Sequence, residues 1–176
     1  MFEARDERLV EKAKAGHRKA WMTLLKRYES PVYHYAIRMT GNTHDASDLM
    51  QDIFLSVFRS LDNYRGDGEF RAWLFRIAHF RCMEFYRRKR PQQGLDDVPE
   101  AASEAPCPEM QLHGSQETAA LTRAMQTLPL SQKAVVELKF FGQFTFEDIA
   151  LQLGISANTA KSRLYSALTK LKLELE

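Results

Sequence analysis

Three carboxylates recur along a predicted helix in the first third of this 176-residue chain. Asp45, Asp48 and Asp52 stand at positions i, i+3 and i+7, and this spacing brings them to one face of a helix. Such a face can hold a divalent metal for phosphate chemistry, dock on a basic partner, or simply be solvated. Because no second acidic cluster is predicted to face this helix, we favour the docking surface and predict no metal site.

A second segment interleaves aromatic rings with arginines. Residues 64–90 read YRGDGEFRAWLFRIAHFRCMEFYRRKR. One helix of a small domain cannot bury all of these rings, and rings that stack on unpaired bases beside phosphate-binding arginines are typical of single-strand binding. Trp73, Leu74 and Ile77 fall at helical spacing, so for these three we favour a place in the core. For residues 87–90 a solvated helix end is the alternative, because cations are favourable there in any case.

The sharpest local pattern is FTFEDIALQLGISANTAKSRLYSALTKLK at residues 144–172. An apolar helix face that includes Phe146 and Ile149 is followed by Gly154 at a tight turn, and Ser156 is placed to cap a second helix. The polar front of that second helix can contact phosphates and base edges in a major groove. The pattern predicts a DNA-binding helix-turn-helix, and an αα-hairpin with a solvated face is the alternative.

Weaker patterns involve cysteine and histidine. His79 and Cys82 lie one helical turn apart, and Cys107 and His113 could complete a tetrahedral metal set. We favour the simpler interpretation, in which Cys82 is half-buried and Cys107 is ungrouped. The glycines at 66 and 68 lack the rest of a phosphate-binding loop, and no cofactor is predicted.

Composition and charge narrow the class of protein. Apolar residues make up 44% and charged residues 27%, which excludes wholesale disorder and fibrous repeats. Residues 59–90 hold nine basic and four acidic side chains, whereas residues 91–117 hold six acids and no Lys or Arg. The net charge of +2 is therefore the sum of separate basic and acidic segments. Such a distribution of charge is typical of proteins that bind polyanions. No apolar run approaches the roughly 18 residues that cross a bilayer, and a charged N-terminus with two cysteines makes the cytoplasm the expected location.

Helical periodicity runs through nearly the whole chain, so the predicted fold class is all-α. Helices are expected over 6–15, 18–40, a segment capped by Thr43, 70–90, 116–127, 131–141, 145–153 and 156–175, with Ser131, Thr145 and Ser156 as further caps. Pro31 suggests two helices that meet at Ser30. Residues 91–115 hold four prolines and form a predicted flexible acidic linker, which at full extension spans up to roughly 80 Å. Two small helical domains, 1–90 and 116–176, are therefore expected.

These segments together resemble a bacterial sigma factor of the extracytoplasmic-function (ECF) group. DASDLMQDIFLSVFRSLDNYRGDGEFRAWLFRIA (45–78) is similar to the second conserved region of the family, and residues 128–172 are similar to the fourth. The two occur in family order and are separated by a linker of family length. The resemblance implies a protein without enzymatic activity of its own that binds core RNA polymerase, directs it to specific promoters in response to stress or envelope signals, and assists opening of the duplex.

The resemblance also implies three sets of site residues. Docking on the β′ clamp coiled coil is expected of Asp45, Asp48, Leu49, Gln51, Asp52 and Phe54. Binding of the single-stranded −10 element is expected of Asn63, Tyr64, Arg65, Phe70, Arg71, Arg76, Phe80, Arg87 and Arg88. Binding of the −35 duplex is expected of Ser156, Asn158, Thr159, Lys161, Ser162, Arg163 and Tyr165. The apolar face of the fourth region is expected on the β flap, and an anti-sigma factor is an expected partner.

Strand opening of this kind needs no catalytic group. Unstacking costs a few kcal/mol, and each base–aromatic stack returns roughly 1–3 kcal/mol, so one or two captured bases can hold a bubble. The chain departs from the family pattern at Phe80, where Asn is frequent, and at Ser166, where a basic residue is frequent. A stand-alone helix-turn-helix regulator is the main alternative, and a metal-dependent enzyme that uses the three aspartates is a remote one.

Overall fold

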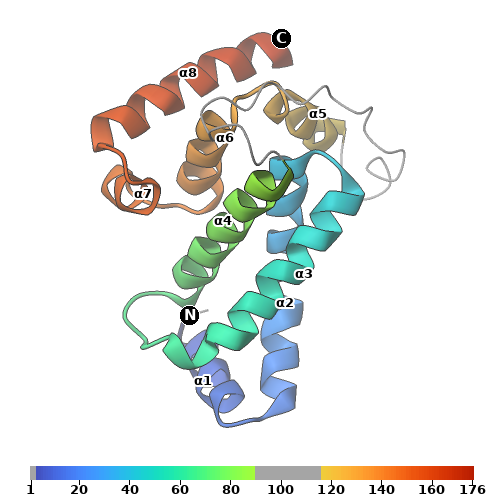
Figure 1. The fold of residues 1–176 in the computed structure, drawn as a ribbon, viewed down its shortest axis with the longest axis vertical. Coiled ribbons are helices and arrows are strands. Elements are labelled where there is room, and N and C mark those ends of the chain that lie inside the picture. The colour runs from blue at the N-terminus through green and yellow to red at the C-terminus, as the bar shows by residue number, and fades with distance from the viewer. Residues whose placement is uncertain (1–2, 90–115) are drawn as a thin grey trace.

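The computed structural model describes residues 3–89 and 116–176, and every regular element in these two ranges is helical. The predicted linker 91–115 lies outside the described residues. The first group contains α1 (Glu3–Lys14), α2 (Arg18–Thr40), α3 (Thr43–Ser60), the 3-10 turn η1 (Leu61–Asn63) and α4 (Phe70–Lys89) (Figure 1). The second contains α5 (Gln116–Met125), α6 (Leu130–Val136), the π-helical turn η4 (Glu137–Phe141), α7 (Phe146–Leu153) and α8 (Ala157–Leu175). The all-α prediction is confirmed.

The long helices α2, α3 and α4 build the core of the first group. Leu49, Ile53, Val57 and Leu61 recur every four residues, and all four are buried. The α2–α3 corner is made by Gly41, whose φ of +75° is in the left-handed region. Asn42 then caps α3, because its side chain accepts a hydrogen bond from the backbone N–H of Asp45 at 2.9 Å. The cap is thus one residue earlier than the predicted Thr43.

Helix α2 is continuous through Pro31, contrary to the predicted break. A proline in a helix interior costs about 3 kcal/mol or more. The residues on both sides of it are buried, however: Leu24 and Tyr28 before it, and Val32 and Tyr35 after it. Burying a large apolar side chain contributes about 1.5–3 kcal/mol, so packing of both halves in one core offsets the lost hydrogen bond.

The second group is organised around α8, whose buried face is formed by Ala160, Leu164, Ala167 and Leu171. Two predicted caps are confirmed: Thr145 accepts from the N–H of Asp148 at 3.1 Å, and Ser156 accepts from the N–H of Thr159 at 3.0 Å. The predicted cap at Ser131 is wrong, because α6 already begins at Leu130 after Pro129.

The two groups touch each other at the C-terminal end of α2, which contacts α5 and α6 (Figure 1). Helix α4 runs beside this junction and presents one side to the helix-turn-helix of α7 and α8. None of the described helices combines the length and the apolar composition that a membrane span requires. The contact between the two groups thus brings α4 close to α7 and α8, which are far from it in sequence.

Candidate nucleic-acid interface and docking surface

On the acidic face of α3 the side chains of Asp48 and Asp52 are exposed, whereas that of Asp45 is largely covered. Basic side chains from the end of α4 lie against this face. The Lys89 Nζ is 2.5 Å from a carboxylate oxygen of Asp45, and the Arg88 guanidinium is 4.0 Å from Asp52. Asp48 projects beyond these contacts toward its helix neighbour His44. In the described ranges, no three metal-ligating side chains converge. The face therefore offers carboxylates that are already balanced by nearby cations.

An apolar groove lies beside that acidic face, between α1, α2 and α3. Three large side chains on its wall are unusually exposed: Met22 at 43%, Leu55 at 51% and Phe58 at 57%. Phe58 packs on the ring of Trp21 with centroids 5.2 Å apart. An exposed apolar patch of this kind marks an interaction surface.

Only some of the predicted docking residues line this groove. Gln51 is exposed at its edge, and Phe54 is largely buried but still lines it. Leu49, by contrast, is fully buried because it belongs to the core series of α3. Leu55 and Phe58 were not among the predicted docking residues, although they follow Gln51 at i+4 and i+7 and so share its helix face.

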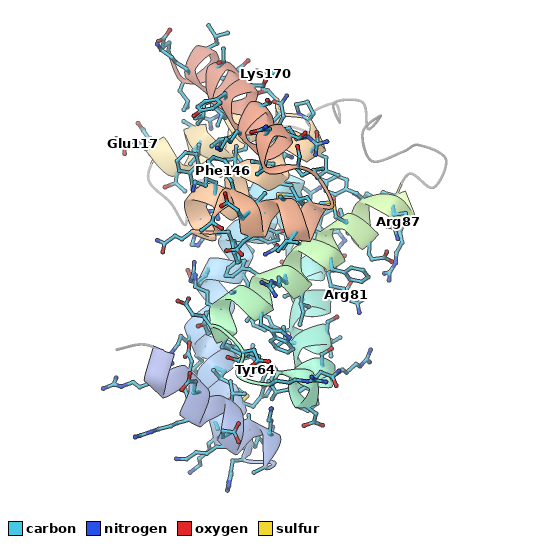
Figure 2. The ribbon with its side chains drawn as sticks, turned by 90° about the vertical axis from the view of Figure 1, so that its left-hand side faces the viewer. Tyr64, Arg81, Arg87, Glu117, Phe146 and Lys170 are labelled. Carbon is cyan, nitrogen blue, oxygen red and sulfur yellow. The ribbon has the colours of Figure 1, made fainter. Side chains whose placement is uncertain are left out.

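The loop before α4 is fastened from within by Tyr64. Its ring is buried against Phe70 and Trp73, its hydroxyl donates to the Gly68 carbonyl at 2.7 Å, and its own carbonyl accepts from Lys14. Figure 2 shows Tyr64 between the helices of the first group. The rings of Tyr64 and Phe70 are therefore not available to a base in this arrangement, whereas Asn63, Arg65 and Asp67 are exposed on the loop.

One side of α4 carries a stripe of basic and apolar groups. Arg76, Phe80, Met83 and Arg87 recur at i, i+4, i+7 and i+11, and Phe80 is 57% exposed. Arg87 also pairs with Glu84 one turn earlier. We call these four residues the α4 stripe. An exposed ring beside exposed arginines suits contacts with an unstacked strand.

The predicted residue Arg71 is used differently. Its guanidinium lies 4.9 Å from the ring centroid of Phe75 and donates to the carbonyl of Phe141 at 3.0 Å. Because Phe141 belongs to the second group, Arg71 links the two groups in this arrangement. Arg71 therefore does not belong to the α4 stripe.

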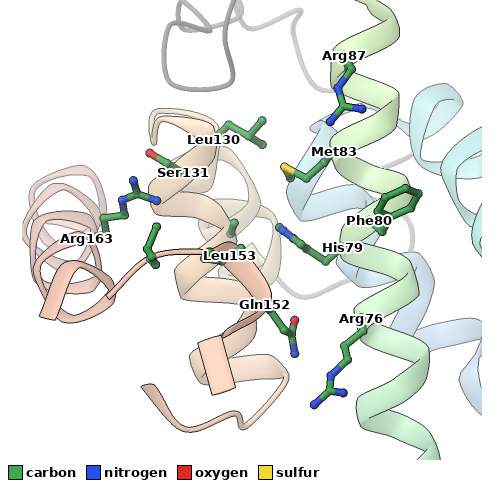
Figure 3. Close-up of a pocket in the computed structure, with 13 residues that line it drawn as sticks. Arg76, His79, Phe80, Met83, Arg87, Leu130, Ser131, Gln152, Leu153 and Arg163 are labelled. Atoms are coloured by element: carbon green, nitrogen blue, oxygen red, sulfur yellow. The ribbon is translucent and has the colours of Figure 1, made fainter. Parts of the chain in front are cut away.

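A cleft of about 670 Å³ separates the α4 stripe from the helix-turn-helix. Its opposite wall includes Gln152, the turn at Gly154 and Ile155, and Arg163. Figure 3 shows His79 and Met83 projecting from α4 into this space. Burial lowers the pKa of His79 to about 4, so its imidazole is neutral at physiological pH.

The structure gives no support to a metal role for Cys82. The side chain is completely buried, and burial raises the pKa of its thiol to about 12. A thiol that keeps its proton is neither a good nucleophile nor a metal ligand. The other two members of that hypothetical set, Cys107 and His113, lie outside the described residues.

The first turns of α8 present the predicted duplex-binding residues. Ser156, Asn158, Lys161, Ser162 and Tyr165 are exposed, and Thr159 is half-buried beneath the cap. No acidic side chain lies in the first turn, so the positive helix end is unopposed. Arg163 differs from the others because it lines the cleft.

Comparison with protein families matches both helical groups. Residues 24–92 match Sigma-70 region 2, and residues 118–171 match Sigma-70 region 4. The first range contains the segment 45–78 and the second covers all but the last residue of the segment 128–172, so the predicted resemblance is confirmed.

Individual relatives are RNA polymerase sigma factors as well. The ECF RNA polymerase sigma factor SigE of Mycolicibacterium smegmatis is 34% identical over 156 residues, covering 87% of this chain and 60% of that protein. SigM of Mycobacterium tuberculosis is 31% identical over 172 residues, covering 96% of this chain and 84% of that protein.

Solved structures show the same fold. CnrH, solved with the cytosolic domain of CnrY, has a TM-score of 0.68 at 24% identity and covers 97% of each chain. RpoE of Bartonella quintana, solved with the anti-sigma factor NepR, has a TM-score of 0.69 at 23% identity, covering 89% of this chain and 97% of that one. The two structures share the fold, and the sequence relatives together with the two matched regions show that this chain belongs to the ECF group of RNA polymerase sigma factors.

Proposed function

We propose that this protein acts as an alternative sigma factor, which brings core RNA polymerase to specific promoters and helps to separate the DNA strands. The observation that carries the proposal is the coexistence of three surfaces on one small chain. They are the acidic and apolar face of α3, the basic and aromatic α4 stripe with its preceding loop, and the polar N-terminal turns of α8. Each surface suits a different partner.

Docking on polymerase is assigned to the face of α3. Apolar side chains at the centre of an interface carry most of its binding energy, and charges around them give orientation and speed of association. Leu55 and Phe58 supply the apolar centre, and Asp48 and Asp52 supply exposed charge. A coiled coil that presents apolar knobs flanked by basic side chains, the expected chemistry of the β′ clamp, fits this face.

Strand separation is assigned to the loop at 62–69 and the α4 stripe. Asn63 and Arg65 offer hydrogen-bond donors on the exposed side of the loop, while buried Tyr64 holds the loop in place. Phe80 supplies the exposed ring that Tyr64 does not. A stack of about 1–3 kcal/mol on such a ring offsets part of the unstacking cost.

Duplex recognition is assigned to the first turns of α8. The N-terminal end of a recognition helix enters a major groove, where Asn158 and Lys161 can reach base edges and phosphates. A stand-alone helix-turn-helix regulator would use the same turns. It leaves the exposed apolar groove on α3 without a role, and the groove is therefore the feature that favours the sigma factor.

A regulatory partner is also part of the proposal. The structures of CnrH and RpoE were solved with the cytosolic domain of CnrY and with the anti-sigma factor NepR. We infer that an anti-sigma factor of the same general class controls this chain, with release under stress as the inducing step.

The first prediction concerns docking. The double variant Leu55→Glu, Phe58→Glu should weaken binding to core polymerase about 30-fold or more, because loss of apolar anchors costs about 2 kcal/mol or more. Both side chains are exposed, so the helix content and melting temperature should stay near those of the wild type. Titration of labelled protein with core polymerase measures the affinity.

The matched control is Thr23→Glu, Ser30→Glu, which places the same two charges at exposed positions of α2 that do not line the groove. It should bind polymerase like the wild type. Equal affinities for the double variant and this control would remove the groove from the docking surface.

The second prediction concerns strand opening. Alanines at Asn63, Arg65 and Asp67 should sharply reduce permanganate-reactive thymines near the start site in complexes with polymerase, because the exposed groups that hold a captured base are lost. Tyr64 and the two glycines stay, so the loop keeps its internal fastening. Polymerase binding and −35 binding should not change.

Alanines at Glu7, Glu11 and Lys12, which are exposed on α1, form the control for this loop variant. If the loop variant opens promoters as well as this control does, the loop is only a connector. Base capture would then belong to the α4 stripe alone.

The third prediction concerns the duplex. For −35 DNA, Lys161→Ala in the full chain should flatten the slope of the logarithm of the association constant against the logarithm of the salt concentration by about 0.9. The reason is that one phosphate contact is lost. Lys170→Ala, on an exposed part of α8 several turns later, should leave the slope unchanged. A slope that stays the same in Lys161→Ala would exclude this side chain from the phosphate contacts.

A further inference from the structure

The cleft between α4 and the helix-turn-helix gathers positive charge. Three guanidinium groups line it: those of Arg76 and Arg87 on α4, and that of Arg163 on α8. None of the described residues that line it is acidic, and Glu84, which pairs with Arg87, is not part of the lining. Arginine binds phosphate through two parallel hydrogen bonds, because its planar fork matches the spacing of two phosphate oxygens. The charge of the cleft therefore fits an anion that carries phosphate groups.

The surface between these arginines is apolar. Met83 projects from α4 into the cleft, and Leu130, Leu153 and Ile155 line the opposite wall (Figure 3). The imidazole of His79 projects into the same space and is neutral, because burial lowers its pKa to about 4. A flat organic ring can therefore be covered on both sides without the burial of a further charge. Phosphate groups joined to a flat ring are the chemistry of a nucleotide.

The side-chain amide of Gln152 lacks hydrogen-bonding partners. Both of its polar atoms are buried, and neither is bonded to any group among the described residues. The residue lines the cleft, and Figure 3 shows its side chain projecting from α7 toward α4. An unpartnered buried amide costs free energy, because its bonds to water are lost and not replaced. A ligand that offers one donor and one acceptor side by side can supply both bonds after a small turn of this side chain.

The edge of adenine presents such a pair. A glutamine amide binds the N6 amino group and N7 of adenine together, whereas guanine offers two acceptors, O6 and N7, which suit arginine instead. Gln152 is therefore expected to prefer adenine to guanine. The cleft volume of about 670 Å³ lies within the range of about 300–1,000 Å³ that is usual for small-ligand pockets. One nucleotide fits a space of this size, and a DNA duplex does not.

We propose that this cleft is a binding site for an adenine nucleotide, whose phosphates are held by the arginines, whose base is covered by the apolar walls and whose base edge is bound by Gln152. The site itself does not depend on the proposed function. One consequence does: Arg76 and Arg87 also belong to the α4 stripe, so a bound nucleotide and a separated −10 strand compete for the same side chains.

Titration calorimetry of the full chain with ATP in a magnesium-free buffer tests the site. ATP should bind with a stoichiometry of one, and about tenfold or more tightly than GTP, because Gln152 discriminates between the two bases. Inorganic tripolyphosphate, which carries the charge without the base, should also bind at least tenfold more weakly than ATP. Failure of ATP to bind would overturn the proposal. Equal affinities for ATP and tripolyphosphate would show that the arginines alone attract anions, and would overturn it as well.

Variants of Gln152 test the base contact. Gln152→Leu should weaken ATP binding about tenfold and leave tripolyphosphate binding unchanged, whereas Gln116→Leu, on an exposed part of α5, is the matched control. The melting temperature of Gln152→Leu should not fall, because an unpartnered buried amide is removed. Gln152→Arg should reverse the preference from ATP to GTP. A lower melting temperature with unchanged ATP affinity would make Gln152 a purely structural residue and overturn its role in binding.

The wall formed by α4 is tested by Arg76→Ala. This variant should weaken the binding of ATP and of tripolyphosphate alike by about tenfold, because a charge-assisted phosphate contact is lost. Arg123→Ala removes the same charge from an exposed part of α5 outside the cleft and should bind both like the wild type. Unchanged ATP affinity in Arg76→Ala would place the nucleotide elsewhere and overturn the site.

Competition with DNA has its own readout. ATP should displace a labelled single-stranded −10 oligonucleotide from the wild-type chain, and should do so about tenfold less effectively from Gln152→Leu. If ATP binds but displaces no strand, the site stands and the competition fails. If Gln152→Leu weakens binding of the strand but not of ATP, an adenine of the promoter strand is the ligand and the nucleotide site is overturned. If the wild type directs no promoter opening with polymerase, the proposed function fails, and the ATP titration is unaffected.

Discussion

A buried carboxylate at the junction of the two helical groups constrains the rest of the arrangement. Glu137 has its hydrogen-bonding partner, Arg38, on a helix that is 99 residues away in sequence. Once that pair forms, Lys133 and Gln126 meet the free carbonyls at the end of α2, which the helix itself leaves without partners. The position of α4 against the helix-turn-helix follows from these contacts. The internal geometry of each group does not require them.

The first group shows how one helix serves both stability and binding. On α3, Leu49, Ile53 and Val57 form the core, while Leu55 and Phe58 face the groove. Exposing large apolar side chains gives up about 1.5–3 kcal/mol each that burial would have contributed. A partner that covers them recovers this energy on binding. The acidic residues beside the groove are held near cations of α4, which moderates their mutual repulsion in the free protein.

Local features were predictable because they depend on neighbours in sequence. The i, i+4 series of α3 and the caps at Thr145 and Ser156 need only helical geometry and a short polar side chain. The family resemblance rests on the same local patterns. The polar turns of α8 were likewise recognisable from residue types alone.

Features that depend on distant contacts were not predictable in this way. Continuity through Pro31 needs the packing of both halves of α2, and the burial of Tyr64 needs Phe70 and Trp73 around it. Phe58 is exposed because α1 and α2 do not cover this part of α3. No local sequence pattern marks Glu137 and Lys133 as buried, and their partners Arg38 and Met39 lie more than 90 residues away in sequence.

A sigma factor confers promoter-specific initiation on core RNA polymerase. Run-off transcription on the promoter of its own operon, with core polymerase and with or without the purified protein, is the decisive measurement of this role. We expect a discrete transcript of defined length only when both components are present. Specific binding of the protein to that DNA without any such transcript would exclude a sigma factor and identify a stand-alone DNA-binding regulator instead.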